Sequence, residues 1–200
     1  MMQEPWFVSD DSGSIEVICG GMFSGKTEEL LRRARRAVIA GQRVILFKPS
    51  KDVRYSRTHV VSHDRSDMES IPVRDAEEIP SRCVEADVVC VDEAQFFDHS
   101  LVDVANELAN RGQRIIIAGL DMDFEGKPFE PVPQLLAVAE FVTKLHAVCT
   151  KSGRMAHFSE RISGGTERIL IGEAESYEPR ARHCFKGAGV KTEPAQKGRT

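Results

Sequence analysis

The sequence contains no apolar run long enough to cross a membrane. Residues 1–6 also lack the basic region and the apolar core of a secretory signal. We therefore expect a cytoplasmic protein with no membrane partner. The 41% of hydrophobic residues among 200 suffices for the core of one domain with a small additional subdomain.

An excess of positive charge is absent as well. Lys and Arg number 27 against 31 Asp and Glu, and the formal net charge of -4 gives no general attraction to nucleic acid. A local basic patch is formed by Arg32, Arg33, Arg35 and Arg36. We interpret this patch as a solvated helix face rather than a DNA-binding surface, and expect no nucleic-acid partner.

The cysteines do not form the even set that is typical of a secreted, disulfide-bonded domain. There are five: Cys19, Cys83, Cys90, Cys149 and Cys184. Cys19 and Cys90 lie in apolar segments, where we expect them to be small core residues.

Residues 20–27 fit the phosphate-binding pattern G-x-x-x-x-G-K-S/T. In this pattern backbone N–H groups surround phosphate oxygens, the lysine reaches the β- and γ-phosphates, and the threonine hydroxyl meets magnesium. An apolar strand is expected before the loop at 15–19 and a helix after it at 28–37. This context favours a nucleoside triphosphate site over a chance glycine turn. Its residues are Gly20, Gly21, Met22, Phe23, Ser24, Gly25, Lys26 and Thr27.

A second apolar strand at 43–47 follows the first helix, and this βαβ spacing predicts a parallel sheet. The polar segment 50–68 shows no apolar periodicity, so we expect a long functional or mobile loop. The other expected elements are short or apolar strands at 71–73, 88–91, 114–120 and 141–149, and helices at 75–83, 99–111 and 133–140.

The strand at 88–91 ends in Asp92 and Glu93. A carboxylate at the carboxyl end of such a strand can hold magnesium opposite the phosphate loop. Two adjacent acids permit two roles, with Asp92 facing the metal and Glu93 acting as general base. The alternative is an acidic start to a surface loop. Ala94 and Gln95 follow and complete the expected nucleotide-binding set.

The sequence changes character after residue 149. Alternating segments at 157–162 and 167–172 flank a glycine turn and predict a β-hairpin that is too small to fold alone. We expect a phosphate-binding α/β domain at 13–149, a subdomain at 150–185, and disordered ends at 1–12 and 186–200.

Several motifs together resemble the type II thymidine kinases, from about residue 13 to residue 185. They are the loop 20–27, Phe47-Lys48-Pro49, residues 52–56, the run DEAQFF at 92–97, Leu120-Asp121, Lys127-Pro128-Phe129 and residues 171–177. The resemblance implies a RecA-like parallel sheet with helices on both faces, a C-terminal lasso subdomain and a homotetramer. It also implies transfer of the ATP γ-phosphate to the 5′-hydroxyl of thymidine, with Mg²⁺.

The resemblance also implies residue roles. Glu93 is the general base, Lys26 and Arg54 are the cations on the transferring phosphoryl group, and Thr27 and Asp92 hold magnesium. Phe96 and Phe129 could be core residues, but polar loops at the ligand-binding edge favour a pocket. The implied nucleoside-binding residues are Met22, Phe96, Leu120, Phe124, Phe129, Ile169, Leu170, Ile171, Gly172 and Tyr177.

The sequence departs from the family at its zinc site, which two C-x-x-C or C-x-x-H pairs form. Here Cys149 is followed by Ser152, and Ala181 precedes Cys184, so two of four ligands are missing. Two thiolates leave a tetrahedral site open unless a histidine replaces them. The candidates are His146, His157 and His183. We expect no bound zinc, and a Cys149–Cys184 disulfide is a further alternative that a reducing cytoplasm disfavours.

Two other functions remain as alternatives. A RecA-like ATPase acting on nucleic acid would need a basic groove or a stacking platform, and the sequence offers neither. A nucleotide-binding regulator without catalysis is disfavoured by the presence of Lys26, Asp92 and Glu93 together.

Overall fold

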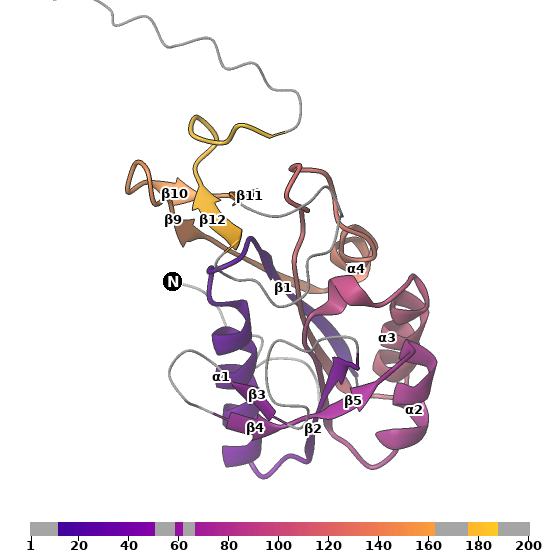
Figure 1. Ribbon diagram of the computed structural model, residues 1–200. Helices are drawn as coiled ribbons and strands as arrows, with labels where there is room; N and C mark the ends of the chain where they lie inside the picture. Colours follow the sequence, from indigo (N-terminus) through magenta and orange to yellow (C-terminus); the bar gives the residue numbers. More distant parts are fainter. Residues whose placement is uncertain (1–11, 51–58, 62–66, 163–175, 188–200) are drawn as a thin grey trace, which may run out of the picture.

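The computed structural model describes residues 12–50, 59–61, 67–162 and 176–187 (Figure 1). Its centre is a six-stranded sheet in the order β5-β2-β6-β7-β1-β8, and every neighbouring pair is parallel. This confirms the expected parallel α/β fold. The strands are β1 (Ser14–Gly20), β2 (Val44–Pro49), β5 (Ile71–Val73), β6 (Val88–Val91), β7 (Arg114–Gly119) and β8 (Phe141–Leu145).

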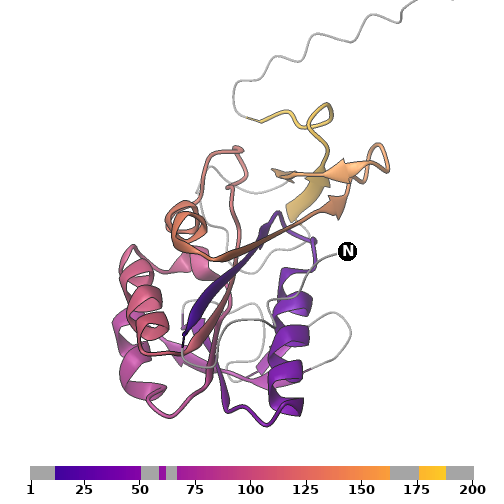
Figure 2. The same cartoon turned by 180° about the vertical axis from the view of Figure 1, so that it is seen from behind.

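Helices cover both faces of this sheet (Figures 1 and 2). The helix α1 (Lys26–Ile39) packs on one face, and α2 (Ile79–Arg82), α3 (Ser100–Asn110) and α4 (Val132–Val138) pack on the other. Successive strand residues point to opposite faces, so Ile115 and Ile117 join the core under α3 while Ile116 joins the core under α1. The inner strands β6 and β7 are mostly apolar because both faces of the sheet are covered there.

Two short 3₁₀ helices complete the domain, η1 (Ala76–Glu78) and η2 (Ala94–Phe96). The helix expected at 75–83 is divided between η1 and α2, and it begins at a capping box formed by Asp75 and Glu78. Asp92 and Glu93 lie between the end of β6 and the start of η2.

Two expectations about the core domain were wrong in part. The segment 50–68 was expected to be a loop, but β3 (His59–Val61) and β4 (Asp67–Glu69) within it pair antiparallel. The strand expected at 141–149 leaves the sheet after Leu145. Its last part forms β9 (Ala147–Val148), which pairs with β10 (Met155–Ala156). An apolar run does not reveal the point at which the chain turns away from its sheet.

The C-terminal strands lie beyond the end of β1 that leads into α1 (Figure 1). There β11 (Phe158–Arg161) pairs antiparallel with β12 (Tyr177–Arg180). The hairpin partner expected at 167–172 lies outside the described residues, as do the chain ends at 1–11 and 188–200. Across the described part of the chain, no helix has the length and apolar character of a membrane span.

Candidate active site

The phosphate-binding loop connects the end of β1 to the start of α1. A Cβ atom at Gly20 would lie 2.3 Å from the carbonyl oxygen of Leu145, so no side chain fits there. The Nζ of Lys26 and the Oγ of Ser24 each donate a hydrogen bond of 2.8 Å to the carbonyl oxygen of Gly21. These bonds close the loop, which leads directly into the first turn of α1, and helix N-termini favour the binding of phosphate.

The hydroxyl of Thr27 donates to Oδ2 of Asp92 at 3.1 Å. The other oxygen, Oδ1, accepts the backbone N–H of Glu93 at 2.9 Å. Asp92 is buried, and burial together with the charge of Glu93 raises its pKa to about 7. A threonine hydroxyl beside a carboxylate matches the oxygen ligands that Mg²⁺ prefers, so the pair expected from the sequence fits the ion.

Glu93 follows with a left-handed backbone, φ 53°, which is unusual for a residue that is not glycine. Its carboxylate accepts a hydrogen bond from Nε2 of Gln95. The Oε1 of Gln95 accepts the backbone N–H of Leu120 at 2.9 Å. Through these two hydrogen bonds the buried Gln95 joins the ends of β6 and β7 and fixes the direction of the Glu93 carboxylate. A constrained backbone of this kind is common at functional sites.

The expected nucleoside-binding residues lie in several loops at the same edge of the sheet. Met22, Phe96, Leu120 and Phe124 are half-buried, whereas Phe129 is buried. The guanidinium of Arg161 covers Phe124 and bonds to the hydroxyl of Tyr177, so the structure brings these two aromatic residues to one place. Arg54, Ile169, Leu170, Ile171 and Gly172 lie outside the described residues.

Ser159 is a site residue that sequence reasoning missed. Its Oγ accepts the backbone N–H of Met22 at 2.8 Å, across 137 positions of sequence. A Cβ atom at Gly21 would lie 3.1 Å from the same oxygen, so this glycine permits the close approach. The buried serine ties β11 to the phosphate loop. A serine in a short strand carries no motif, and only the fold places it here.

An ion pair behind the loop was also missed. The Nζ of Lys144, on β8, lies 2.8 Å from Oδ2 of the buried Asp121. Burial, and next the charge of Asp121, raises the pKa of the Cys19 thiol to about 11. Cys19 is therefore a neutral core residue, as expected.

A family model described as "Thymidine kinase" matches residues 13–185. The chain belongs to the thymidine kinase family. It is 58% identical to a thymidine kinase of Rhodothermus sp. (strain ITI 518), over 87% of this chain and 82% of that protein. It is 54% identical to one from Bacteroides fragilis (strain YCH46), over 88% of each chain. It is 55% identical to one from Porphyromonas gingivalis (strain ATCC 33277), over 87% of this chain and 85% of that protein.

Among solved structures, domain III of the Thermotoga maritima replication initiation protein DnaA is similar at a TM-score of 0.40 and 18% identity. The similarity covers 66% of this chain and 55% of that chain. Membership of the thymidine kinase family confirms the expected nucleotide-dependent kinase, and it does not favour an ATPase that acts on nucleic acid.

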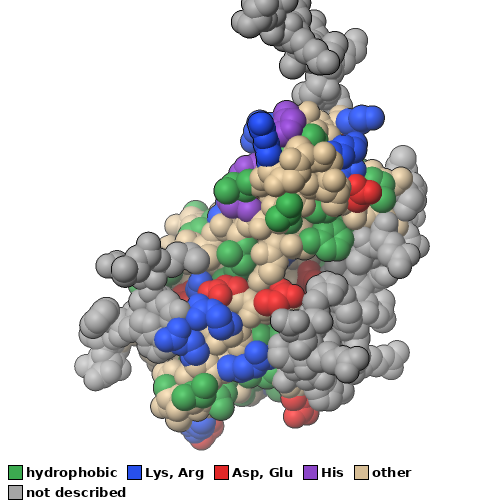
Figure 3. All heavy atoms as spheres, turned by 90° about the vertical axis from the view of Figure 1, so that its left-hand side faces the viewer, with side chains coloured by type: hydrophobic (Ala, Val, Ile, Leu, Met, Phe, Trp, Pro, Cys, Tyr) green, Lys and Arg blue, Asp and Glu red, His purple; other side chains and the backbone are tan. Residues whose placement is uncertain are grey.

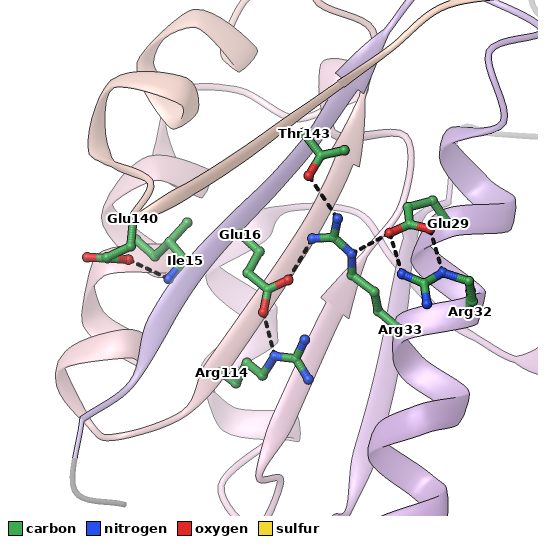
Figure 4. Close-up of polar contacts among 8 residues, drawn as sticks. All are labelled: Ile15, Glu16, Glu29, Arg32, Arg33, Arg114, Glu140 and Thr143. Atoms are coloured by element: carbon green, nitrogen blue, oxygen red, sulfur yellow. Dashed lines mark hydrogen bonds and ion pairs between the residues drawn. The ribbon is translucent and has the colours of Figure 1, made fainter. Parts of the chain in front are cut away.

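The arginines of α1 in this thymidine kinase family member are only partly solvated. Arg32 and Arg36 are exposed, as expected, but Arg33 is 8% exposed. Figure 4 shows Arg33 donating to Oε2 of Glu16 at 2.7 Å and to Thr143 at 2.8 Å. Interpreting Arg33 as part of a solvated face was therefore wrong. Because Glu16 is fully buried in β1, the cation is needed there to balance its charge.

Acidic side chains accompany the remaining basic ones on this side of the molecule. Figure 3 shows the molecule from the left-hand side of Figure 1. On the described part of this side, Lys and Arg lie next to Asp and Glu rather than forming a continuous basic surface. One such pair joins Arg32 to Glu29 at 2.7 Å. Among the residues of this face that the structure describes, the basic side chains therefore form no continuous patch (Figure 3).

The positions of the family zinc site form a small apolar cluster. Cys149 and Ala181 are buried with Ala147 and Ala156, and Cys184 packs against them with both thiols free. Burial raises the pKa of Cys149, but hydrogen bonds from the Ser152 side chain and from nearby backbone N–H groups outweigh it and lower the pKa to about 6.

Zinc does not fit this donor set. Within the described ranges, no group of three or more His, Cys, Asp and Glu side chains could hold a metal ion. His146 and His157 contact one another edge to face, with ring centroids 4.5 Å apart. Two thiols without further ligands do not close a tetrahedral site.

Proposed function

We propose that this chain transfers the γ-phosphoryl group of ATP to the 5′-hydroxyl of thymidine at the carboxyl edge of the sheet. The observation that carries the proposal is the hydrogen bond between Thr27 of the phosphate loop and the buried Asp92, with Glu93 beside it. Family membership supports the reaction class and the nucleoside. The geometry at Lys26, Thr27, Asp92 and Glu93 supports their proposed roles, whereas ATP as the donor and the role of Arg54 follow from the resemblance.

In the proposed reaction the loop N–H groups bind the phosphates of ATP. Lys26 exchanges its bond to the Gly21 carbonyl for one to the β- and γ-phosphates. A Mg²⁺ ion held by Thr27 and Asp92 would neutralise charge on the phosphoryl oxygens. Arg54 is proposed as a second cation on the transferring group.

Glu93 is the proposed general base for the 5′-hydroxyl of thymidine. Its carboxylate accepts a hydrogen bond from Gln95, and an ionised carboxylate is an acceptor for the hydroxyl proton. Gln95 is fixed by Leu120, so the base is oriented before the substrate binds. Phosphoryl transfer depends mainly on positioning and charge neutralisation, and this set provides both.

We propose that the thymine base binds between the loop 121–129 and the C-terminal subdomain. The residues that line this proposed pocket are Met22, Phe96, Leu120, Phe124, Phe129 and Tyr177. Residues 169–172 are proposed to belong to the lasso. The same proposal includes two domains, at 13–149 and 150–185, and a homotetrameric assembly. It also includes a cytoplasmic location and no nucleic-acid partner.

The test compares activators of ATP turnover. Purified protein with ATP and Mg²⁺ should hydrolyse ATP slowly, and thymidine should stimulate turnover with formation of thymidine 5′-monophosphate. Stimulation by single-stranded DNA, without stimulation by thymidine, would overturn the proposal. Deoxyuridine, deoxycytidine and deoxyguanosine tested in the same assay measure nucleoside preference.

A further inference from the structure

Arg161, at the end of β11, lies between two residues of the proposed base pocket. Its guanidinium carbon is 3.8 Å from the ring centroid of Phe124 and 5.2 Å from that of Tyr177. Its Nε and Nη2 atoms donate to the hydroxyl oxygen of Tyr177 at 3.2 and 2.6 Å. A guanidinium is planar and stacks on aromatic faces, so a flat cation covers Phe124 on the side of Tyr177.

A nucleobase and this guanidinium need the same space. A separation of 3.8 Å is a van der Waals contact and leaves no room for a second flat group between Arg161 and the ring of Phe124. A base that stacks on this face must therefore move the guanidinium away. We propose that Arg161 occupies the base position of the nucleoside site and that thymidine binds by displacing it.

The strand β11 is held in place by contacts other than the Arg161 side chain. The backbone of β11 remains paired with β12 from Phe158 to Arg161. The strand is also anchored by Ser159 at the phosphate loop and by an ion pair of 2.8 Å between Glu160 and Arg180. Arg161 itself is half-buried at the end of this strand.

Displacement has a quantitative signature. Only the fraction of molecules with an uncovered Phe124 binds the base, so the apparent affinity for every nucleoside is reduced by that same fraction. Removing the guanidinium should therefore tighten binding of different nucleosides by one common factor. The affinity for ATP should be unaffected, since Phe124 and Tyr177 lie outside the phosphate loop.

This inference rests on the proposed function, which places the base against Phe124 and Tyr177. The test measures the dissociation constants of thymidine and deoxyuridine by calorimetry, and the Michaelis constants of thymidine and ATP. The variants are Arg161→Met, which keeps the apolar stem, and Arg161→Lys, which keeps the positive charge but lacks the planar guanidinium. Arg182→Met is the matched control, because Arg182 lies 4.9 Å over Phe158, outside the proposed pocket.

We expect Arg161→Met to lower the dissociation constants of thymidine and deoxyuridine by the same factor. This factor is about tenfold if Phe124 is uncovered in about 10% of the molecules. Arg161→Lys should give a smaller gain, and Arg182→Met and the ATP constant should not change. Weaker or unchanged thymidine binding by a folded Arg161→Met would overturn the displacement. If Arg161→Met does not fold, Arg161→Lys must show the gain for the proposal to stand. Lack of thymidine phosphorylation by the unsubstituted chain would instead overturn the proposed function.

Discussion

Asp92 and Glu93 are adjacent in the sequence, yet their side chains have different partners. Asp92 bonds to the phosphate loop through Thr27, whereas Glu93 bonds to Gln95. The left-handed backbone at Glu93 accompanies this division of roles. The sequence predicted both acids and the threonine, because a motif carries them. It did not predict what Gln95 bonds to, because that contact depends on where β7 ends.

Lys26→Ala should weaken ATP binding and phosphoryl transfer together. The ammonium faces charge that is present in the ground state as well as in the transition state. We expect the kcat/KM for ATP to fall about a hundredfold or more, measured by steady-state kinetics with saturating thymidine. Lys151→Ala is the control, because Lys151 is an exposed lysine outside the phosphate loop and the loop 121–129. Equal kinetics for both variants would remove Lys26 from the mechanism.

At the scale of elements, β1 and α1 flank the phosphate loop and are joined by buried charges. Glu16 of β1 bonds to Arg33 of α1 and to Arg114 of β7. The sequence predicted β1 and β7 as apolar strands and α3 as a helix. The sequence did not predict β12 as the partner of β11, because two short polar strands separated by a long connection share no sequence period.

Arg33→Met should destabilise the fold strongly. It removes a buried partner of Glu16 and leaves a buried carboxylate poorly compensated, at a cost of about 3–5 kcal/mol. Urea unfolding measures this cost. Arg32→Met is the matched control on the same helix, and it should change the free energy of unfolding by less than about 0.5 kcal/mol. A loss of the same size in both variants would mean that the buried pair of Arg33 and Glu16 stabilises the fold no more than the exposed Arg32 does.

Ser159→Ala should separate the phosphate loop from β11. The N–H of Met22 then loses its buried acceptor, which costs about 1–3 kcal/mol. We expect a lower midpoint in urea and a higher Michaelis constant for ATP. Ser81→Ala, at an exposed serine in α2, serves as the control. A midpoint equal to that of the unsubstituted chain would show that the bond does not hold the two segments together.

At the scale of the whole molecule, the described strands of the C-terminal subdomain are joined by packing and by ion pairs. Arg180 is buried and bonds to Glu160 and Glu178 at 2.8 and 2.5 Å. The sequence showed the missing zinc ligands directly. It could not show that Cys149 and Cys184 share an apolar cluster, because the two positions meet only in the folded chain.

Purified protein should therefore contain well under one zinc per chain. A chelator should leave its melting temperature and activity unchanged, because removing a structural zinc that is present costs folding free energy. Elemental analysis measures the metal content, and thermal unfolding with and without chelator measures its effect. One zinc per chain, released by Cys149→Ser, would show that a histidine completes the site after all.

The most direct test of the account is single-turnover transfer of the γ-phosphate from ATP to thymidine by Glu93→Gln. The substitution keeps the size and polarity of the side chain but removes the proton acceptor. We predict that ATP and thymidine bind with near-normal dissociation constants while the rate of transfer falls about a hundredfold or more. Near-normal transfer by this variant would contradict the assignment of Glu93 as the base and, with it, the proposed mechanism.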